Sequence, residues 1–329
     1  MAISKTGETA KKYLERFTDT PTLSLARKMY AENKLLFTNL EHARTTLRRL
    51  RGSSGKFNLS EMSDKRFVGT TPKDIPISLS EPNEEYHLPL ANNNILLISD
   101  LHIPYHDVKA IEAAVKYGKE QKVNTVFING DMLDFHLLSR FQKDPQARSV
   151  KEEFDTARAM LEYLRYEFPK AKIIWLKGNH DKRYEHWLFN KAPEIFNDSY
   201  YQLESRLRLN ELKIELLDDL IMCKAGKLFI THGHLMIRGV FAPVNAARGL
   251  YLRAKQSCVI GHTHSVSEHT EKNLSGELTS TWSTGCLCEL RPAYDPFVNK
   301  HAHGFAHVRF NKNGDFTVRN YRIDKGKIL

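Results

Sequence analysis

The chain of 329 residues has few cysteines and no long apolar run. Its four cysteines lie far apart or as C-x-C, without the C-x-x-C spacing of a zinc ribbon or a redox dithiol. We therefore expect buried, reduced thiols. No stretch approaches the roughly 20 apolar residues of a membrane-spanning helix, and the start has no signal-peptide core. These features predict a cytoplasmic protein without a membrane partner.

The remaining composition is typical of a globular protein, with 41% hydrophobic and 27% charged residues. The formal net charge of +10 is uneven, because residues 1–56 hold twelve basic and five acidic side chains, a balance of +7. A basic segment attached to a nearly neutral body indicates an anionic partner.

Apolar residues recur at helical spacing in three stretches between residues 8 and 51. We therefore predict a small, all-α, helix-turn-helix-like domain over residues 1–55. Its third helix carries Arg44, Arg48 and Arg51 on one side, where such a domain contacts nucleic acid. The alternative is a solvated basic face on a small helical bundle. Residues 56–94 are rich in Ser, Gly, Pro and Asn and predict a linker.

Residues 95–329 predict an α/β catalytic domain. Short apolar runs at 95–99, 125–128, 173–176, 228–231 and 258–260 indicate strands, with amphipathic helices around 108–115 and 150–164. Strand and helix alternation indicates an α/β fold, and the pattern after residue 277 indicates a second, more antiparallel sheet.

Each of the five predicted strands is followed by residues that can bind metals. In order, these motifs are Asp100-Leu-His102, Gly130-Asp131, Gly178-Asn179-His180-Asp181, His232-Gly-His234 and Gly261-His262-Thr-His264. Residues at i and i+2 of an extended segment point the same way, so Asp100 with His102 can reach one locus. Imidazole and carboxylate ligands without thiolate favour Mn²⁺, with Fe or Zn²⁺ as alternatives. The ligands outnumber the needs of one ion, which predicts two divalent ions.

This ordered series resembles the calcineurin-like metallophosphoesterase superfamily over roughly residues 95–265. The resemblance implies a four-layer αββα double-sheet sandwich. It also implies metal ligands at Asp100, His102, Asp131, Asn179, His232, His262 and His264, with Asp131 shared by both ions. His180 would contact the phosphate and act with Asp131 in catalysis. Asp134 and Asp181 would orient imidazoles from outside the ligand set.

The implied reaction is hydrolysis of a phosphate ester by metal-activated hydroxide. The G-N-H-D form of the third motif resembles the phosphodiesterase and nuclease branches, which include phage-encoded proteins, so we expect a nucleic-acid substrate. Residues near the motifs that could line a groove for it are Lys182, Arg183, Tyr184, Trp187, Arg238 and Arg248. Two alternatives are a phosphomonoesterase or small-nucleotide hydrolase whose N-terminal domain serves assembly alone, and a non-catalytic binding protein. The sequence identifies no protein partner.

Overall fold

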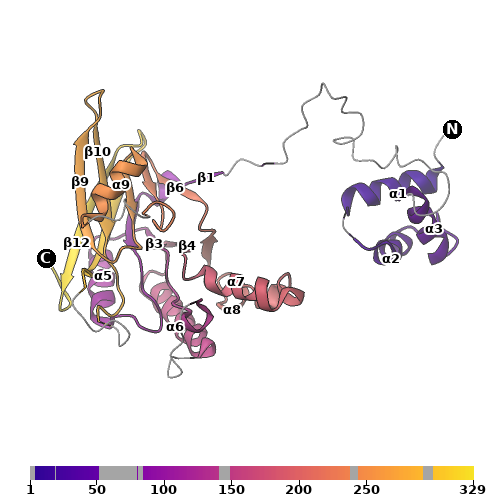
Figure 1. Cartoon of the computed structure of the whole chain (residues 1–329), viewed down its shortest axis with the longest axis horizontal. Helices are drawn as coiled ribbons and strands as arrows, with labels where there is room; N and C mark the ends of the chain where they lie inside the picture. Colours follow the sequence, from indigo (N-terminus) through magenta and orange to yellow (C-terminus); the bar gives the residue numbers. More distant parts are fainter. Residues whose placement is uncertain are drawn as a thin grey trace. The chain divides into compact units, whose positions relative to one another are not determined.

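The structure is a computed structural model that describes residues 4–18, 20–51, 80, 84–140, 149–237, 244–291 and 299–329. The chain divides into two compact units, Met1–Pro82 and Asn83–Leu329 (Figure 1). Each unit has a hydrophobic core of its own. Most of the predicted linker, 56–79 and 81–83, lies outside the described residues, as does Arg238.

The described part of the first unit, which includes residues 4–18 and 20–51, contains three helices, as predicted. They are α1 (Lys5–Arg16), α2 (Thr22–Glu32) and α3 (Leu40–Leu50). The side chain of Ser4 accepts a hydrogen bond from the N–H of Gly7, and that of Asn39 accepts one from the N–H of His42. Such N-caps satisfy donors that the first helical turn leaves without partners. The apolar stripes meet in a core that includes Leu14, Leu25 and Leu47.

The second unit alternates strands with helices. Its helices are α5 (Val108–Glu120), α6 (Val150–Glu167), α7 (Lys182–Lys191), α8 (Leu203–Arg206) and α9 (Ala246–Ala254). Its strands are β1 (Glu85–His87), β2 (Asn94–Ile98), β3 (Thr125–Asn129), β4 (Lys172–Leu176), β5 (Ile214–Leu217), β6 (Met222–Ala225), β7 (Leu228–Ile230), β8 (Cys258–Ile260), β9 (Val266–Lys272), β10 (Leu278–Thr284), β11 (His303–Phe310), β12 (Phe316–Asp324) and β13 (Lys327–Ile328).

These strands form two mixed sheets. The seven-stranded sheet has the order β13-β12-β11-β2-β3-β4-β5, in which β2 to β5 run parallel. The six-stranded sheet has the order β1-β6-β7-β8-β10-β9. The two sheets pack face to face through side chains that include Leu97, Phe127 and Val259.

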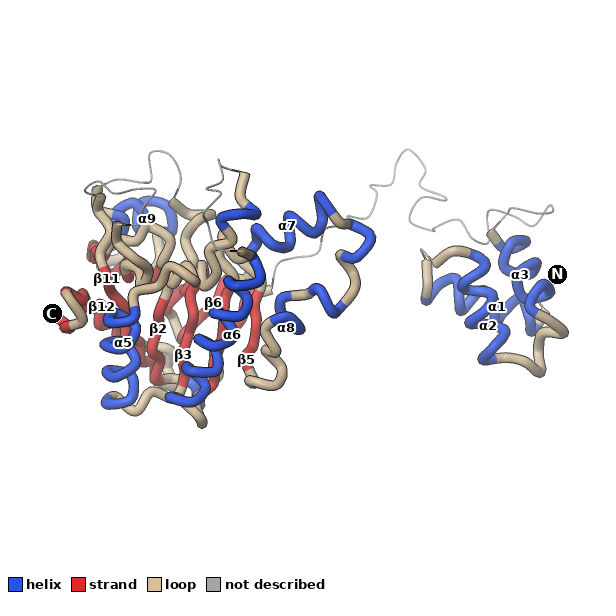
Figure 2. Tube along the Cα trace, turned by 90° about the horizontal axis from the view of Figure 1, so that it is seen from below, coloured by secondary structure: helices blue, strands red, loops and turns tan. Residues whose placement is uncertain are grey.

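Helices cover the outer faces and complete the predicted four-layer αββα sandwich. On the seven-stranded sheet, Leu96 of β2 packs in one core with Ile111 of α5 and Leu161 of α6, and Figure 2 shows both helices along this sheet. On the other sheet, Leu250 of α9 packs with Ile260 of β8. Both faces of β2 are thus buried, which explains its continuous apolar run. Among the described residues, no helix has the length and apolar character needed to cross a bilayer.

The second unit begins earlier than the sequence pattern predicts. Strand β1 lies within the predicted linker and pairs parallel with β6, with Tyr86 opposite Cys223. It has only three residues, of which just Tyr86 is partly buried. So short an edge strand has no apolar run to mark it.

Candidate metal centre

Five loops converge at one end of the sandwich. Those after β2, β3 and β4 leave the seven-stranded sheet, and those after β7 and β8 leave the six-stranded sheet. Each loop carries one of the five motifs. The packing of the two sheets therefore brings together residues that are up to 164 positions apart, from Asp100 to His264.

The backbone of these loops is left-handed at most of the predicted ligands. Positive φ angles occur at Asp100 (54°), His102 (46°), Asp131 (48°), His262 (60°) and His264 (52°). Such angles are uncommon outside glycine and cluster at functional sites. The prediction that Asp100 and His102 are aligned by an extended segment is therefore wrong, because tight turns after the strand aim them instead.

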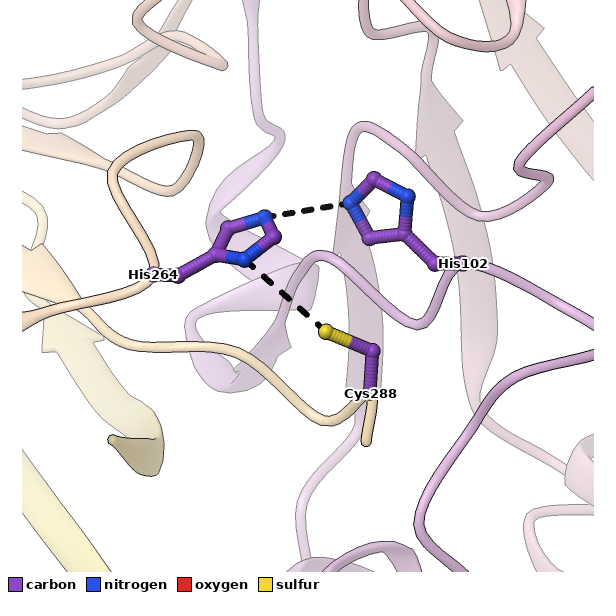
Figure 3. A group of neighbouring side chains, drawn as sticks. All are labelled: His102, His264 and Cys288. Carbon is purple, nitrogen blue, oxygen red and sulfur yellow. Dashed lines mark hydrogen bonds between the residues drawn. The ribbon is translucent and has the colours of Figure 1, made fainter. Parts of the chain in front are cut away.

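The first group of converging atoms comes from Asp100, His102 and His264. Nε2 of His264 lies 3.1 Å from Nε2 of His102 and 3.3 Å from Oδ1 of Asp100. Nε2 of His102 lies 3.9 Å from the same Asp100 oxygen and 3.8 Å from Oδ2 of Asp131. Two imidazole nitrogens and two carboxylates thus face one small space, with the two rings drawn in Figure 3.

A second group comes from Asp131, His232 and His262, whose ligand atoms lie within 4.8 Å of one another. His232 is fully buried, and its Nδ1 lies 2.8 Å from the carbonyl oxygen of Asn129, to which it donates. In the neutral ring, which is the form that binds a metal, that bond leaves the lone pair on Nε2. This Nε2 lies 3.1 Å from Oδ2 of Asp131 but forms no hydrogen bond within the described residues, and neither does the buried Oδ1 of Asn179.

Asp131 lies between the two groups. Its Oδ2 approaches His102 on one side and His232 on the other, at 3.8 and 3.1 Å. Its Oδ1 accepts a hydrogen bond of 2.8 Å from the N–H of His180. One carboxylate oxygen is therefore directed into the space that both groups share.

Strong local fields hold the central groups in charged states. Burial alone would raise the pKa of Asp131, but the imidazoles of His232 and His180 hold it well below its usual range. Burial would lower the pKa of His232, yet the Asp131 carboxylate raises it to about 10. A buried, ionised carboxylate needs a compensating cation, which protons on imidazole or a divalent ion can provide.

At two motif positions, the absence of a side chain on glycine makes room for the carboxylates of predicted ligands. A Cβ atom added to Gly178 would lie 2.2 Å from Oδ1 of Asp131, and one added to Gly261 would lie 2.5 Å from Oδ2 of Asp100. Any other residue would push these carboxylates aside. These glycines are required by close approach and not only by the turn itself.

Asp134 connects the first group to His180. Its Oδ1 lies 2.9 Å from Nδ1 of His102 and 3.0 Å from Nδ1 of His180. Nε2 of His180 in turn lies 3.0 Å from a guanidinium nitrogen of Arg183, which also donates to the carbonyl oxygen of Asp134. With Oδ1 of Asp134 next to both Nδ1 atoms, Nε2 is the ring nitrogen of each histidine that faces away from Asp134.

Asp181 has a different role from the one expected. Its carboxylate accepts hydrogen bonds from the N–H groups of Leu133 and Gly178, at 3.0 and 2.8 Å, and from the indole of Trp175. It therefore ties the loops after β3 and β4 together and does not orient an imidazole. Burial, followed by the charge of Asp131, raises its pKa to about 7.

Cys288 is a neighbour of the site that the sequence did not reveal. All four cysteines are buried and free, as predicted, but Sγ of Cys288 lies 3.9 Å from Nδ1 of His264 (Figure 3). His264 therefore directs Nε2 to Asp100 and Nδ1 to a thiol. The only sequence signal was the C-x-C pair, which by itself does not identify a partner.

The residues predicted to line a groove for nucleic acid differ in their surroundings. Arg183 and Trp187 line a cavity of about 500 Å³ that also contacts Asn179. Tyr184 is buried, Lys182 is ion-paired with Glu185 and Asp218, and Arg248 lies exposed on α9. A second hollow of about 430 Å³, near Asn94 and Phe316, contains none of the predicted site residues.

The arginines of α3 also differ from one another. Arg48 is exposed, and Arg44 pairs with Glu41 at 3.2 Å. The guanidinium of Arg51 instead donates to the hydroxyl of Thr22 and to the carbonyl oxygen of Thr20, both at 2.7 Å. The expectation that Arg51 is directed at nucleic acid is therefore wrong, because it joins the end of α3 to the start of α2.

The donor set fits a pair of divalent ions. It combines imidazole nitrogens and carboxylate oxygens, with the thiol of Cys288 beside His102 and His264. Among the described residues, Nε2 of His232 and Oδ1 of Asn179 are buried without a hydrogen-bond partner. Borderline metals such as Mn²⁺, Fe or Zn²⁺ accept these donors. Asp100, His102, Asp131 and His264 would hold one ion, and Asp131, Asn179, His232 and His262 the other. This ligand assignment stays a prediction.

The chain was compared with protein families, with characterised proteins and with solved structures. A family model described as calcineurin-like phosphoesterase matches residues 94–283, more than half of the chain. The Gene 54 proteins of Mycobacterium phages L5 and D29 are each 28% identical over 187 residues, covering 54% of this chain and 72% of theirs. The Escherichia coli phosphoesterase YfcE is 16% identical with a TM-score of 0.37, covering 72% of this chain and 96% of its own. The Pseudomonas putida nuclease MPE is 15% identical with a TM-score of 0.30, covering 73% and 91%.

Proposed function

We propose that this chain, which belongs to the calcineurin-like phosphoesterase family, is a metal-dependent phosphodiesterase that acts on nucleic acid. The position of Asp131 carries the proposal. Its Oδ2 lies between the two groups of ligand atoms, and the same oxygen is 4.0 Å from Nε2 of His180. One carboxylate thus borders both predicted ion positions and the predicted catalytic imidazole.

Two bound divalent ions would supply a nucleophile near neutral pH and stabilise charge on the phosphoryl oxygens. The remaining chemistry belongs to side chains of the chain itself. Because Asp134 accepts from Nδ1 of His180, Nε2 is the nitrogen that meets the substrate. We assign His180 and Arg183 to contact the phosphate. The guanidinium of Arg183 donates to Nε2 of His180 in the free protein, so Arg183 would turn to pair with a phosphate oxygen, and Nε2 could then bind a proton and deliver it to the leaving oxygen.

A diester in nucleic acid is favoured by charge. The rim beside His180 carries Arg183, Arg140 and Lys191, and the first unit carries the excess of basic residues. Contacts from Lys and Arg to phosphates supply much of the affinity for nucleic acid without reading its sequence. The first unit would then hold the polymer while the second cleaves it.

The test is an assay of the full chain, stripped of metal by a chelator and reloaded with Mn²⁺. Bis(p-nitrophenyl) phosphate, p-nitrophenyl phosphate and an oligonucleotide serve as substrates. We expect Mn²⁺-dependent cleavage of the two diesters, and a loss of about 10²- to 10⁴-fold in His180→Ala, the range for removal of a proton donor. The control is His87→Ala, an exposed histidine on β1. Turnover of the monoester alone would favour the phosphomonoesterase alternative, and no turnover of any ester would favour a binding protein.

A further inference from the structure

A cavity of about 500 Å³ extends along α7 from the metal centre. Asn179 and Arg183 line it at the end that contains the predicted site. The rest of α7 contributes His186, Trp187, Asn190 and Lys191, with Arg140 among the residues contributed by the loop after β3. The cavity therefore reaches the predicted metal ligand Asn179 and continues along α7 to Lys191.

The face of α7 that lines this cavity is not needed for the core. Residues 183, 186, 187, 190 and 191 recur at the spacing of one helical face. Tyr184 and Leu188, on the other side, are buried in the hydrophobic core. The buried face already supplies the packing contacts that hold α7 in the fold. Packing therefore does not explain why the cavity face carries cationic and aromatic side chains.

The cavity lining is cationic. Arg140, Arg183 and Lys191 contribute positive charge, and none of the described residues that line the cavity is acidic. The acidic residue of α7 nearest to them, Glu185, pairs instead with Lys177 and Lys182. The lining therefore favours an anionic occupant.

Trp187 adds an aromatic surface to this cationic lining. It is 38% exposed, whereas the other two tryptophans of the chain, Trp175 and Trp282, are 0% and 6% exposed. An indole left open beside arginine and lysine is suited to stacking on a base whose phosphates pair with the cations. A base in a duplex has no free face for such contact, so the occupant must be single-stranded.

We infer that the α7 cavity binds a nucleotide of single-stranded nucleic acid next to the scissile phosphodiester, with Trp187 stacking on its base. The inference rests on the proposed function, because Arg183 lies both in this cavity and 3.0 Å from His180. Arg183 and Lys191 are separated by about 12 Å along the helix at 1.5 Å per residue. That length accommodates at least one nucleotide beyond the cleaved bond.

Tryptophan fluorescence provides a direct binding test, because Trp187 is the exposed fluorophore. A single-stranded oligothymidylate is titrated into the metal-free full chain, in which it is not cleaved. We expect saturable quenching in the wild type and none in Trp187→Phe. The same oligonucleotide annealed to its complement should quench much less. Equal quenching by the duplex would overturn the assignment to single strands.

Kinetics with Mn²⁺ then separate the inference from the proposed function. We expect Trp187→Ala to lower kcat/KM for the oligonucleotide by about 5- to 100-fold, the effect of one lost base stack, and far less for bis(p-nitrophenyl) phosphate. Phe189→Ala is the matched control, because Phe189 is an exposed aromatic residue of the same helix outside the cavity lining. If Trp187→Ala reduces both substrates equally or neither, the inference fails while diester hydrolysis stands. If the wild type cleaves no diester, the proposed function itself is wrong, whatever the fluorescence titration shows.

Discussion

Oδ1 of Asp134 lies 3.0 Å from Nδ1 of His180, and the same oxygen lies 2.9 Å from Nδ1 of His102. One carboxylate oxygen therefore orients both a predicted metal ligand and the predicted proton donor. Groups that orient ligands in this way typically change metal affinity or activity by about 10- to 100-fold when they are removed.

We accordingly expect Asp134→Ala to lower both Mn²⁺ affinity and kcat on bis(p-nitrophenyl) phosphate by about 10- to 100-fold. Asp134→Asn should have a smaller effect, because its amide oxygen can still accept from one imidazole. Mn²⁺ titrations of the activity of each variant give both quantities. Wild-type values in Asp134→Ala would show that His102 and His180 are held by other contacts.

Metal binding should stabilise the second unit. Asp100 and Asp131 are buried carboxylates whose pKa values lie below their usual range, so a divalent ion can bind them in the folded state. A ligand that binds only the folded state adds about 2.7 kcal/mol at 100 times its Kd. Calorimetry with and without Mn²⁺ should show this gain, and chelation should remove it. Asp131→Asn should abolish the gain, whereas Asp324→Asn, at an exposed position on β12, should keep it. The same gain in both variants would place the ions elsewhere.

Cys288 tests whether a thiol can orient a metal-binding imidazole. Its Sγ is the partner of Nδ1 of His264, so Cys288→Ala should weaken Mn²⁺ binding by about 10-fold. Cys288→Ser should weaken it less, because a hydroxyl can accept the same bond. Cys258→Ala removes another buried thiol, packed against α9, and should reduce stability without changing metal affinity. Equal metal affinity in the variants Cys258→Ala and Cys288→Ala would remove any special role for Cys288.

The sequence predicted the parts of the fold that depend on local pattern. Runs such as residues 95–99 identify strands because both faces of β2 are buried, and the residues after each strand identify the loops that meet. The left-handed angles at Asp100 and His102 were not predictable, because turn geometry is set by the loop and not by residue preference. Contacts that depend on tertiary packing were also missed, such as those of Cys288 with His264 and of Arg51 with Thr20.

Glu153 should make stability depend on pH. It is buried on α6, where Oε2 accepts from the N–H of Phe135 and Oε1 has no partner within the described residues. Burial raises its pKa to about 8, so the folded state holds this proton more tightly than the unfolded state. The protonated side chain contributes to the free energy of unfolding, and this contribution is fully present below the pKa that Glu153 has in the unfolded chain. It is lost as the pH rises through about 8, at about 1.4 kcal/mol per pH unit.

Glu153→Gln keeps an oxygen for Phe135 and removes the titration. Relative to wild type, its free energy of unfolding should therefore rise between about pH 5 and about pH 8, by a few kcal/mol in total. Urea unfolding at several pH values gives this difference. Glu162→Gln removes an exposed carboxylate from the same helix and controls for the change in net charge. A difference that is constant with pH would show that Glu153 is ionised in the folded protein.

The first unit offers two arginines with opposite expectations. Arg48 is exposed on α3, so Arg48→Gln should weaken nucleic-acid binding and reduce the slope of log K against log salt by about 1, the effect of one lost phosphate contact. Arg51 instead bonds Thr20 and Thr22, so Arg51→Gln should lower the stability of the helical unit by about 1 to 3 kcal/mol. Binding to a labelled oligonucleotide across a salt series and thermal unfolding of the same two proteins measure these effects. If Arg48→Gln leaves the salt slope unchanged, the basic face of α3 is only solvated and the first unit serves another purpose.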